Sequence, residues 1–171
     1  MADYKKKFNK IYDEYVDKIY RFVYVKVSSK ETAEDLTSQA FMKSWQAMKS
    51  GIDVKNPKAF VYQIARNLVI DFYRERAKRP TVSEEFIKFM PDQGVNIEQK
   101  AQQKTDIERT MKLLSKIKPE YQDIVIWHYL DDLSVKEISK ILDKPENNVR
   151  VTLHRALNSL KEESKKLELK S

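Results

Sequence analysis

Residues 117–160 read IKPEYQDIVIWHYLDDLSVKEISKILDKPENNVRVTLHRALNSL, and they carry the clearest fold signal in the chain. Ser134 and Glu137 have the spacing of a capping box, which predicts the start of a short helix with apolar residues at helical spacing. A break at residues 143–145 separates this helix from a longer one that begins at Glu146. A short helix, a tight turn and a longer amphipathic helix are the pattern of a helix-turn-helix. The turn carries Asp143 where glycine is common, and Asp tolerates the left-handed conformation better than most residues.

The last helix has two distinct faces when its residues are projected at about 100° each. The apolar face, which we expect to pack inward, comprises Val149, Leu153, Ala156 and Leu160. The opposite face and its flanks carry Asn147, Asn148, Arg150, Val151, His154 and Arg155. Asn, Arg and His side chains read base edges in the major groove, and Arg also reaches phosphates. The pattern favours a DNA-reading helix; a corner of two helices in a bundle with an ordinary polar face is the alternative.

Upstream of this stretch, the sequence predicts a small helical bundle. Apolar residues in steps of three and four predict helices over residues 5–27 and 31–49, and Asn56-Pro57 starts a third that runs to about residue 78. Residues 81–104 show little periodicity, and a short helix over 81–89 is compatible with their sequence. We therefore expect an all-α fold with two small helical domains, residues 1–80 and 105–171, joined by a flexible linker at 81–104.

Basic residues gather at the end of the third predicted helix. Residues 55–79 hold seven Lys or Arg residues against Asp71 and Glu75. Such a local cluster indicates a surface that faces phosphates. A solvated helix end, whose cations favour the helix dipole, explains the same cluster equally well.

The composition excludes several classes of function. The 171 residues include no Cys, two His and two Gly, so a disulfide framework, a cysteine-ligated zinc site and the glycine-rich loops of nucleotide enzymes are excluded. No pair of carboxylates and no nucleophile–base pair has a catalytic spacing, so we predict no enzyme activity, no cofactor and no metal. Neither a membrane-length apolar run nor a signal peptide is present, which predicts no membrane insertion and a cytoplasmic location.

Three segments resemble RNA polymerase sigma factors. Residues 117–160 resemble region 4 in the motifs Leu-Ser-x-x-Glu-Ile, Pro-Glu-x-x-Val-Arg and Leu-His-Arg-Ala, residues 33–45 (AEDLTSQAFMKSW) resemble region 2.2, and residues 64–74 (IARNLVIDFYR) resemble regions 2.3 and 2.4. With only a linker in place of region 3, the layout is that of the extracytoplasmic-function (ECF) group of the sigma-70 family. The resemblance implies a transcription initiation factor that binds core RNA polymerase and promoter DNA, with an anti-sigma factor as a further partner that the family allows. A free-standing helix-turn-helix transcriptional regulator is the alternative, but it leaves residues 33–45 and 64–74 unexplained.

The resemblance also assigns sites. Region 4 reads the −35 element as duplex with the polar stripe of the last helix, and region 2 holds the melted −10 strand with Lys58, Tyr62, Arg66, Asn67, Tyr73, Arg74 and Arg76. We expect Tyr62 and Tyr73 to project away from the apolar stripe and to offer stacking platforms, and the loop at residues 50–58 corresponds to the family's base-capturing loop. The polymerase clamp is contacted in region 2.2 by Asp35, Leu36, Gln39, Phe41 and Trp45. Core positions suit Leu36, Phe41 and Trp45 as well, and Ser38-Gln39 replaces the family's usual Gln-Glu.

The distance between the two promoter elements constrains the linker. More than two turns of DNA separate them, which is roughly 70 Å or more at about 34–36 Å per turn. Residues 81–104 reach roughly 80 Å when fully extended, at about 3.3 Å each. We therefore expect the linker to be largely unfolded when both elements are bound.

Overall fold

The computed structural model describes residues 2–78 and 101–169, with side chains for residues 3–78 and 108–169. Its regular elements are α1 (Ala2–Val27), α2 (Lys30–Lys49), α3 (Pro57–Lys78), α5 (Ala101–Lys116), α6 (Pro119–Val125), the π-helical turn η1 (Ile126–Leu130), α7 (Val135–Leu142) and α8 (Glu146–Leu169). The all-α prediction is confirmed for the described residues. Helix α5 begins at Ala101, inside the segment predicted as linker. The rest of the predicted linker, including the short helix that the sequence allows at 81–89, lies outside the described residues.

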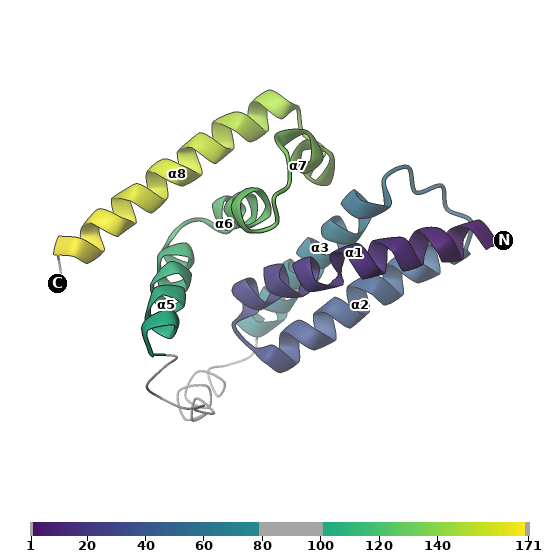
Figure 1. The fold of residues 1–171 in the computed structure, drawn as a ribbon, viewed down its shortest axis with the longest axis horizontal. Coiled ribbons are helices and arrows are strands. Elements are labelled where there is room, and N and C mark those ends of the chain that lie inside the picture. Colours follow the sequence, from purple (N-terminus) through teal and green to yellow (C-terminus); the bar gives the residue numbers. More distant parts are fainter. Residues whose placement is uncertain (1, 79–100, 170–171) are drawn as a thin grey trace.

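Helices α1, α2 and α3 form a three-helix bundle (Figure 1). Ser28 turns the chain between α1 and α2 with a left-handed φ of 56°, and the Ser29 hydroxyl caps α2 by accepting a hydrogen bond from the Thr32 amide over 3.3 Å. Helix α3 begins in the same way, because Asn56 Oδ1 accepts from the amide of Ala59 over 3.1 Å. The buried core of this bundle comprises Ile19, Phe22, Val23, Val27, Ala33, Leu36, Ala40, Phe41, Ala59, Val61, Tyr62, Ala65, Leu68 and Val69.

Helices α7 and α8 form the predicted helix-turn-helix. The capping box is complete, since Ser134 Oγ accepts from the Glu137 amide and Glu137 accepts from the Ser134 amide. Asp143 ends α7 in the left-handed conformation, with φ 53° and ψ 48°, as the turn requires. The inward face of α8 is confirmed, because Val149 and Ala156 are buried.

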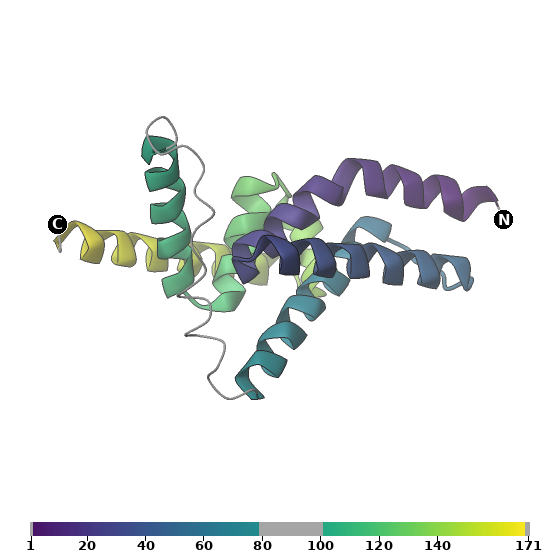
Figure 2. The same cartoon turned by 90° about the horizontal axis from the view of Figure 1, so that it is seen from below.

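The two halves of the chain share one core, where the first half is α1–α3 (residues 2–78) and the second half is α5–α8 (residues 101–169). Trp127 of η1 is fully buried, and its ring centroid lies 5.4 Å from that of Phe22 and 6.1 Å from that of Tyr62. Figure 1 shows α6 and α7 between the bundle and α8, and in both Figure 1 and Figure 2 the free ends of α1 and α8 point to opposite ends of the molecule. Among residues 2–78 and 101–169, no helix combines the length and the apolar character that a membrane span needs.

Candidate nucleic-acid interface

The polar stripe of α8 lies on the surface of the second half. Every side chain predicted to read the −35 element is exposed: Asn147, Asn148, Arg150, Val151, His154 and Arg155. The buried Val149 packs the first turns of α8 against the core. Within the helix, the Thr152 hydroxyl donates to the Asn148 carbonyl over 2.8 Å. A helix fixed in this way can enter the major groove by its N-terminal residues. The structure thus brings all six side chains together on one accessible face.

The candidates on α3 divide by exposure. Asn67, Tyr73 and Arg74 are exposed, and Lys58, Arg66 and Arg76 are half-buried. Tyr73 is anchored as well, because its hydroxyl donates to the backbone carbonyl of Lys26 in α1.

Tyr62 does not project into solvent, so the expectation for this residue was wrong. Its side chain is fully buried, and its hydroxyl donates to Oδ2 of Asp131 over 3.1 Å. The helical projection assumed that α3 buries a single face. In the structure α3 packs against α1, α2 and α7, and Tyr62 itself is covered by Trp127 of η1 and Tyr15 of α1.

Two half-buried cations of α3 are paired with acids of the second half. Lys58 forms an ion pair with Glu137, and Arg66 Nε lies 3.2 Å from Oδ2 of Asp123. Asp123 is buried and also pairs with Lys26, whose Nζ lies 3.0 Å from the other carboxylate oxygen as an ion pair without hydrogen-bond alignment. These acids therefore occupy cations that sequence reasoning assigned to DNA.

A second buried acid, Asp131, lies at the end of η1. Arg21 donates to Oδ1 of its carboxylate over 2.6 Å, Tyr62 donates to Oδ2, and Lys18 donates to its backbone carbonyl over 3.2 Å. Burial raises the pKa of the Asp131 carboxyl, although Arg21, Tyr62 and Lys18 favour its charged form. Burial, and then the nearby Asp131, raise the pKa of Tyr62, which remains a protonated donor.

Sequence reasoning missed Asp123 and Asp131 as members of the site. Asp123 directly precedes the apolar run 124–127 and Asp131 directly follows Leu130, and this position is the only local signal that they carry. Arg66, a partner of Asp123, lies 57 residues away in the chain, and Arg21, a partner of Asp131, lies 110 residues away. No periodicity or short motif reports on pairs at that separation.

The candidate polymerase surface lies on α2, with Asp35 exposed and Gln39 half-buried, where Gln39 donates to Asp35 over 2.9 Å. Trp45 is half-buried, with its ring 5.1 Å from that of Phe8.

The core position that the sequence allowed for Leu36 and Phe41 is the one observed, because both are buried in the bundle. They support the α2 surface and do not form it. Met42, which is 60% exposed on the same helix, is an apolar surface residue that sequence reasoning missed.

Comparison with known proteins relates both halves to sigma factors. Residues 11–79 match the family model of Sigma-70 region 2, and residues 107–160 match that of Sigma-70, region 4. The ECF RNA polymerase sigma factor SigM of Bacillus subtilis (strain 168) is 30% identical over 154 residues, which cover 90% of this chain and 92% of SigM.

Two solved structures have a similar fold. CnrH, in complex with the cytosolic domain of CnrY, aligns with a TM-score of 0.68 and 16% identity over 98% of this chain and 91% of that one. RpoE of Bartonella quintana, in complex with the anti-sigma factor NepR, aligns with a TM-score of 0.62 and 21% identity over 96% of this chain and 98% of that one. At these identities the likeness is one of fold.

Proposed function

Because this chain belongs to the ECF group of the sigma-70 family of RNA polymerase sigma factors, we propose that α8 reads the −35 element and that α3 holds the −10 strand. The chain is a transcription initiation factor that directs core RNA polymerase to promoters. A free-standing helix-turn-helix regulator is not favoured, since it does not account for the region 2 match over residues 11–79. We propose that the protein acts in the cytoplasm, where core polymerase works.

The observation that carries the −35 assignment is the exposed stripe of α8 on a completely capped helix-turn-helix. Arg150 offers the bidentate donor geometry that suits guanine, and Asn147 or Asn148 suits adenine. Val151 is an exposed apolar side chain that suits the methyl group of thymine. Arg155 and His154 lie further along the helix and are proposed to reach the DNA backbone or flanking bases.

For the −10 strand, we propose that Asn67, Tyr73 and Arg74 make the first contacts, because they are exposed at the end of α3. Tyr73 offers a ring for base stacking, and the neighbouring Arg74 offers a cation that can pair with the phosphate backbone of the DNA strand. Capture of an unpaired base favours the melted state and so shifts the opening equilibrium without covalent chemistry. Arg76 is proposed to extend this surface near the end of the helix, and Lys58, Tyr62 and Arg66 are proposed to join it when the second half no longer covers α3.

For core polymerase, we propose the exposed side of α2. Asp35, Gln39 and Trp45 are reachable there, and Met42 adds an exposed apolar anchor between them. Leu36 and Phe41 hold this surface from inside the bundle. An anti-sigma factor is a further proposed partner, as NepR is for RpoE of Bartonella quintana.

The central test is transcription in vitro with purified core polymerase on a genomic promoter library. We expect the protein to copurify with core polymerase at moderate salt and to start transcription at a defined set of promoters, with core polymerase alone as the control. Failure to copurify, or initiation that does not depend on the protein, contradicts the proposal.

A further inference from the structure

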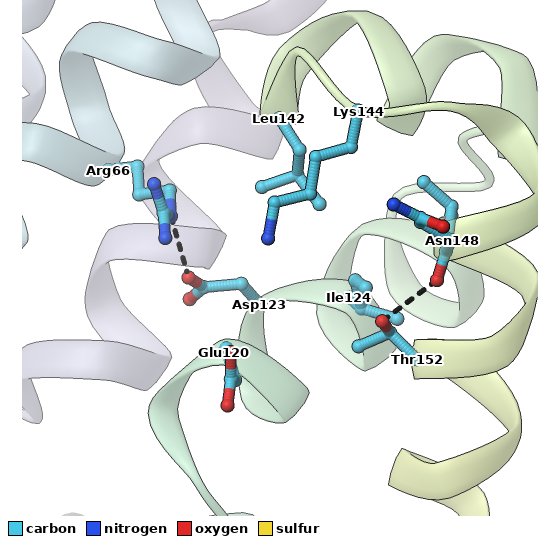
Figure 3. A pocket seen from close by; sticks show the side chains of 9 residues that line it. Arg66, Glu120, Asp123, Ile124, Leu142, Lys144, Asn148 and Thr152 are labelled. Atoms are coloured by element: carbon cyan, nitrogen blue, oxygen red, sulfur yellow. Dashed lines mark hydrogen bonds and ion pairs between the residues drawn. The ribbon is translucent and has the colours of Figure 1, made fainter.

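One pocket brings together a residue proposed for each promoter element. Arg66 of α3 and Asn148 of α8 lie on opposite sides of it, and Asp123 stands between them, paired with Arg66 (Figure 3). The −10 and −35 elements are roughly 70 Å or more apart on DNA. Side chains that line one small pocket cannot contact both elements at once. The arrangement of the two halves seen here is therefore not the one that binds a promoter.

The first carboxylate that holds this arrangement is Asp123 of α6. It pairs with Arg66 from α3 and with Lys26 from α1. The buried amine of Lys26 also donates to the Pro119 carbonyl over 3.2 Å and to Gln122 Oε1 over 2.8 Å. Lys26 thus docks α1 onto α6 by three separate oxygens.

The second carboxylate is Asp131, which the π-helical turn and the left-handed Asp132 (φ 56°) direct into the first half. All of its side-chain partners come from the bundle, with Arg21 from α1 and Tyr62 from α3. Single π-turns occur frequently at functional sites. Here the turn places Asp131 and Trp127 on the same side, where both are buried against the first half.

We propose that Asp123 and Asp131 hold the free chain in a closed state, because they pair with side chains that bind the −10 strand later. We call these two carboxylates and their partners the latch. The carboxylates stand where DNA phosphates and bases would bind Arg66 and Tyr62, and Glu137 does the same for Lys58. This inference rests on the proposed function, because only there do these three side chains contact DNA. Core polymerase holds the two halves apart on a promoter, and this frees Lys58, Tyr62 and Arg66 at the same time.

Several features make this closed state reversible. Arg21 is 46% exposed at its side chain and Arg66 is 34% exposed, so water reaches both when the pairs separate. The buried indole Nε1 of Trp127 has no hydrogen-bond partner, and opening relieves that cost. A cleft lined by Phe22, Val69 and Met111, among others, also remains between the bundle and α5–α6, so the interface is only partly filled.

The test measures the distance between the halves in the free protein. The chain contains no cysteine, so spin labels at two exposed residues beside the contact between Arg21 and the Leu130 carbonyl, Asp17→Cys on α1 and Tyr129→Cys on η1, report without background. We expect one narrow, short distance distribution for the free protein and a longer, broader one for the latch variant Arg21→Gln/Lys26→Met. Neither substitution touches a residue proposed for DNA or polymerase. The matched control is Lys7→Gln/Lys166→Met, which removes the same charge from two exposed lysines, each paired within its own helix.

Two results overturn the latch. One is a broad, long distribution in the unaltered free protein, and the other is a latch variant with normal helix content whose distribution stays as narrow as that of the control. Addition of core polymerase is expected to lengthen the distance in the unaltered protein. If only this last change is missing while the free protein is closed, the failure lies with the proposed function and not with the latch.

A second experiment covers the case in which the latch variant does not fold. Gln63 of α3 donates to the carbonyls of Lys140 and Ile141 in α7, so Gln63→Cys and Lys140→Cys can be joined by a short bis-maleimide. We expect the joined protein to lose at least tenfold in transcription with core polymerase, and the same protein capped with a mono-maleimide to remain active. Equal activity of the joined and capped forms contradicts the latch, whereas inactivity of both contradicts the proposed function.

Discussion

The hydroxyl of Tyr62 donates to Oδ2 of Asp131 over 3.1 Å, and both side chains are fully buried although 69 residues separate them in the chain. An aromatic residue that the sequence assigned to DNA thus serves as a donor inside the protein. The bond joins α3 to the end of η1, and so couples the stability of one half to that of the other.

Tyr62→Phe is expected to lower the free energy of unfolding by about 1.5–3 kcal/mol, because it removes a hydrogen bond to a buried carboxylate. Urea unfolding followed by circular dichroism measures the change. Tyr73→Phe is the control, since its hydroxyl donates to a neutral carbonyl and is expected to contribute about 0.5–1.5 kcal/mol. A loss at Tyr62 no larger than at Tyr73 would show that the Asp131 bond adds nothing to folding.

The charge state of Asp131 makes a pH-dependent contribution to stability. Burial raises the pKa of this carboxyl in the folded chain above its ordinary value of 3.8, although Arg21 and Lys18 from α1 and Tyr62 from α3 face it. The folded state therefore binds the proton more tightly than the unfolded state. The stabilisation that the protonated Asp131 provides is complete below about pH 3.8 and is lost as the pH rises through the pKa of the folded state.

Asp131→Asn removes this titration. We expect the unaltered protein to lose stability relative to the Asn variant as the pH is raised from about 3.5 to 7, in urea unfolding at fixed ionic strength. A relative gain in stability with rising pH would mean that Arg21 and Tyr62 outweigh the burial of the carboxylate.

Local patterns predicted α8 and the helix-turn-helix, because the information lies within a few residues. Val149 and Ala156 pack inward as their spacing indicates, and Asp143 adopts the left-handed turn that its residue type allows. Helix α3 was harder to predict, because a second half from far along the chain covers another of its faces. Tyr62 and the acid Asp131 meet only after both halves have folded, so neither could be placed from spacing.

Ser134→Ala is expected to destabilise the helix-turn-helix. The side chain accepts from the Glu137 amide over 3.1 Å, and loss of such a cap costs about 0.5–2 kcal/mol. Thermal unfolding measures the loss, with Ser139→Ala as the control at a serine that bonds only to the preceding turn. Similar melting temperatures for the two variants would contradict a stabilising cap at α7.

Asn67→Ala and Arg74→Ala are expected to reduce the yield of open promoter complexes several-fold. A contact to one unpaired base contributes about 1–3 kcal/mol, and opening is sensitive to such changes. Permanganate reactivity of unpaired thymines at the −10 element measures the yield. Arg109→Ala on α5 removes the same charge from another exposed site and is the control. Normal reactivity in Arg74→Ala would identify the basic cluster as a solvated helix end.

Arg150→Ala and Asn147→Ala test the face of α8. If either side chain makes a bidentate contact, its loss costs about 1–3 kcal/mol at one base of the −35 element and relaxes preference at that position. Transcription from promoters mutated base by base along the −35 element measures this, with Lys161→Ala further along the same helix as the control. On a promoter whose −10 region is opened by mismatches, the defect is expected to persist, because duplex reading at −35 precedes melting. A uniform loss on every −35 sequence would make Arg150 a phosphate contact, and no loss in either variant would remove the exposed stripe from the DNA interface.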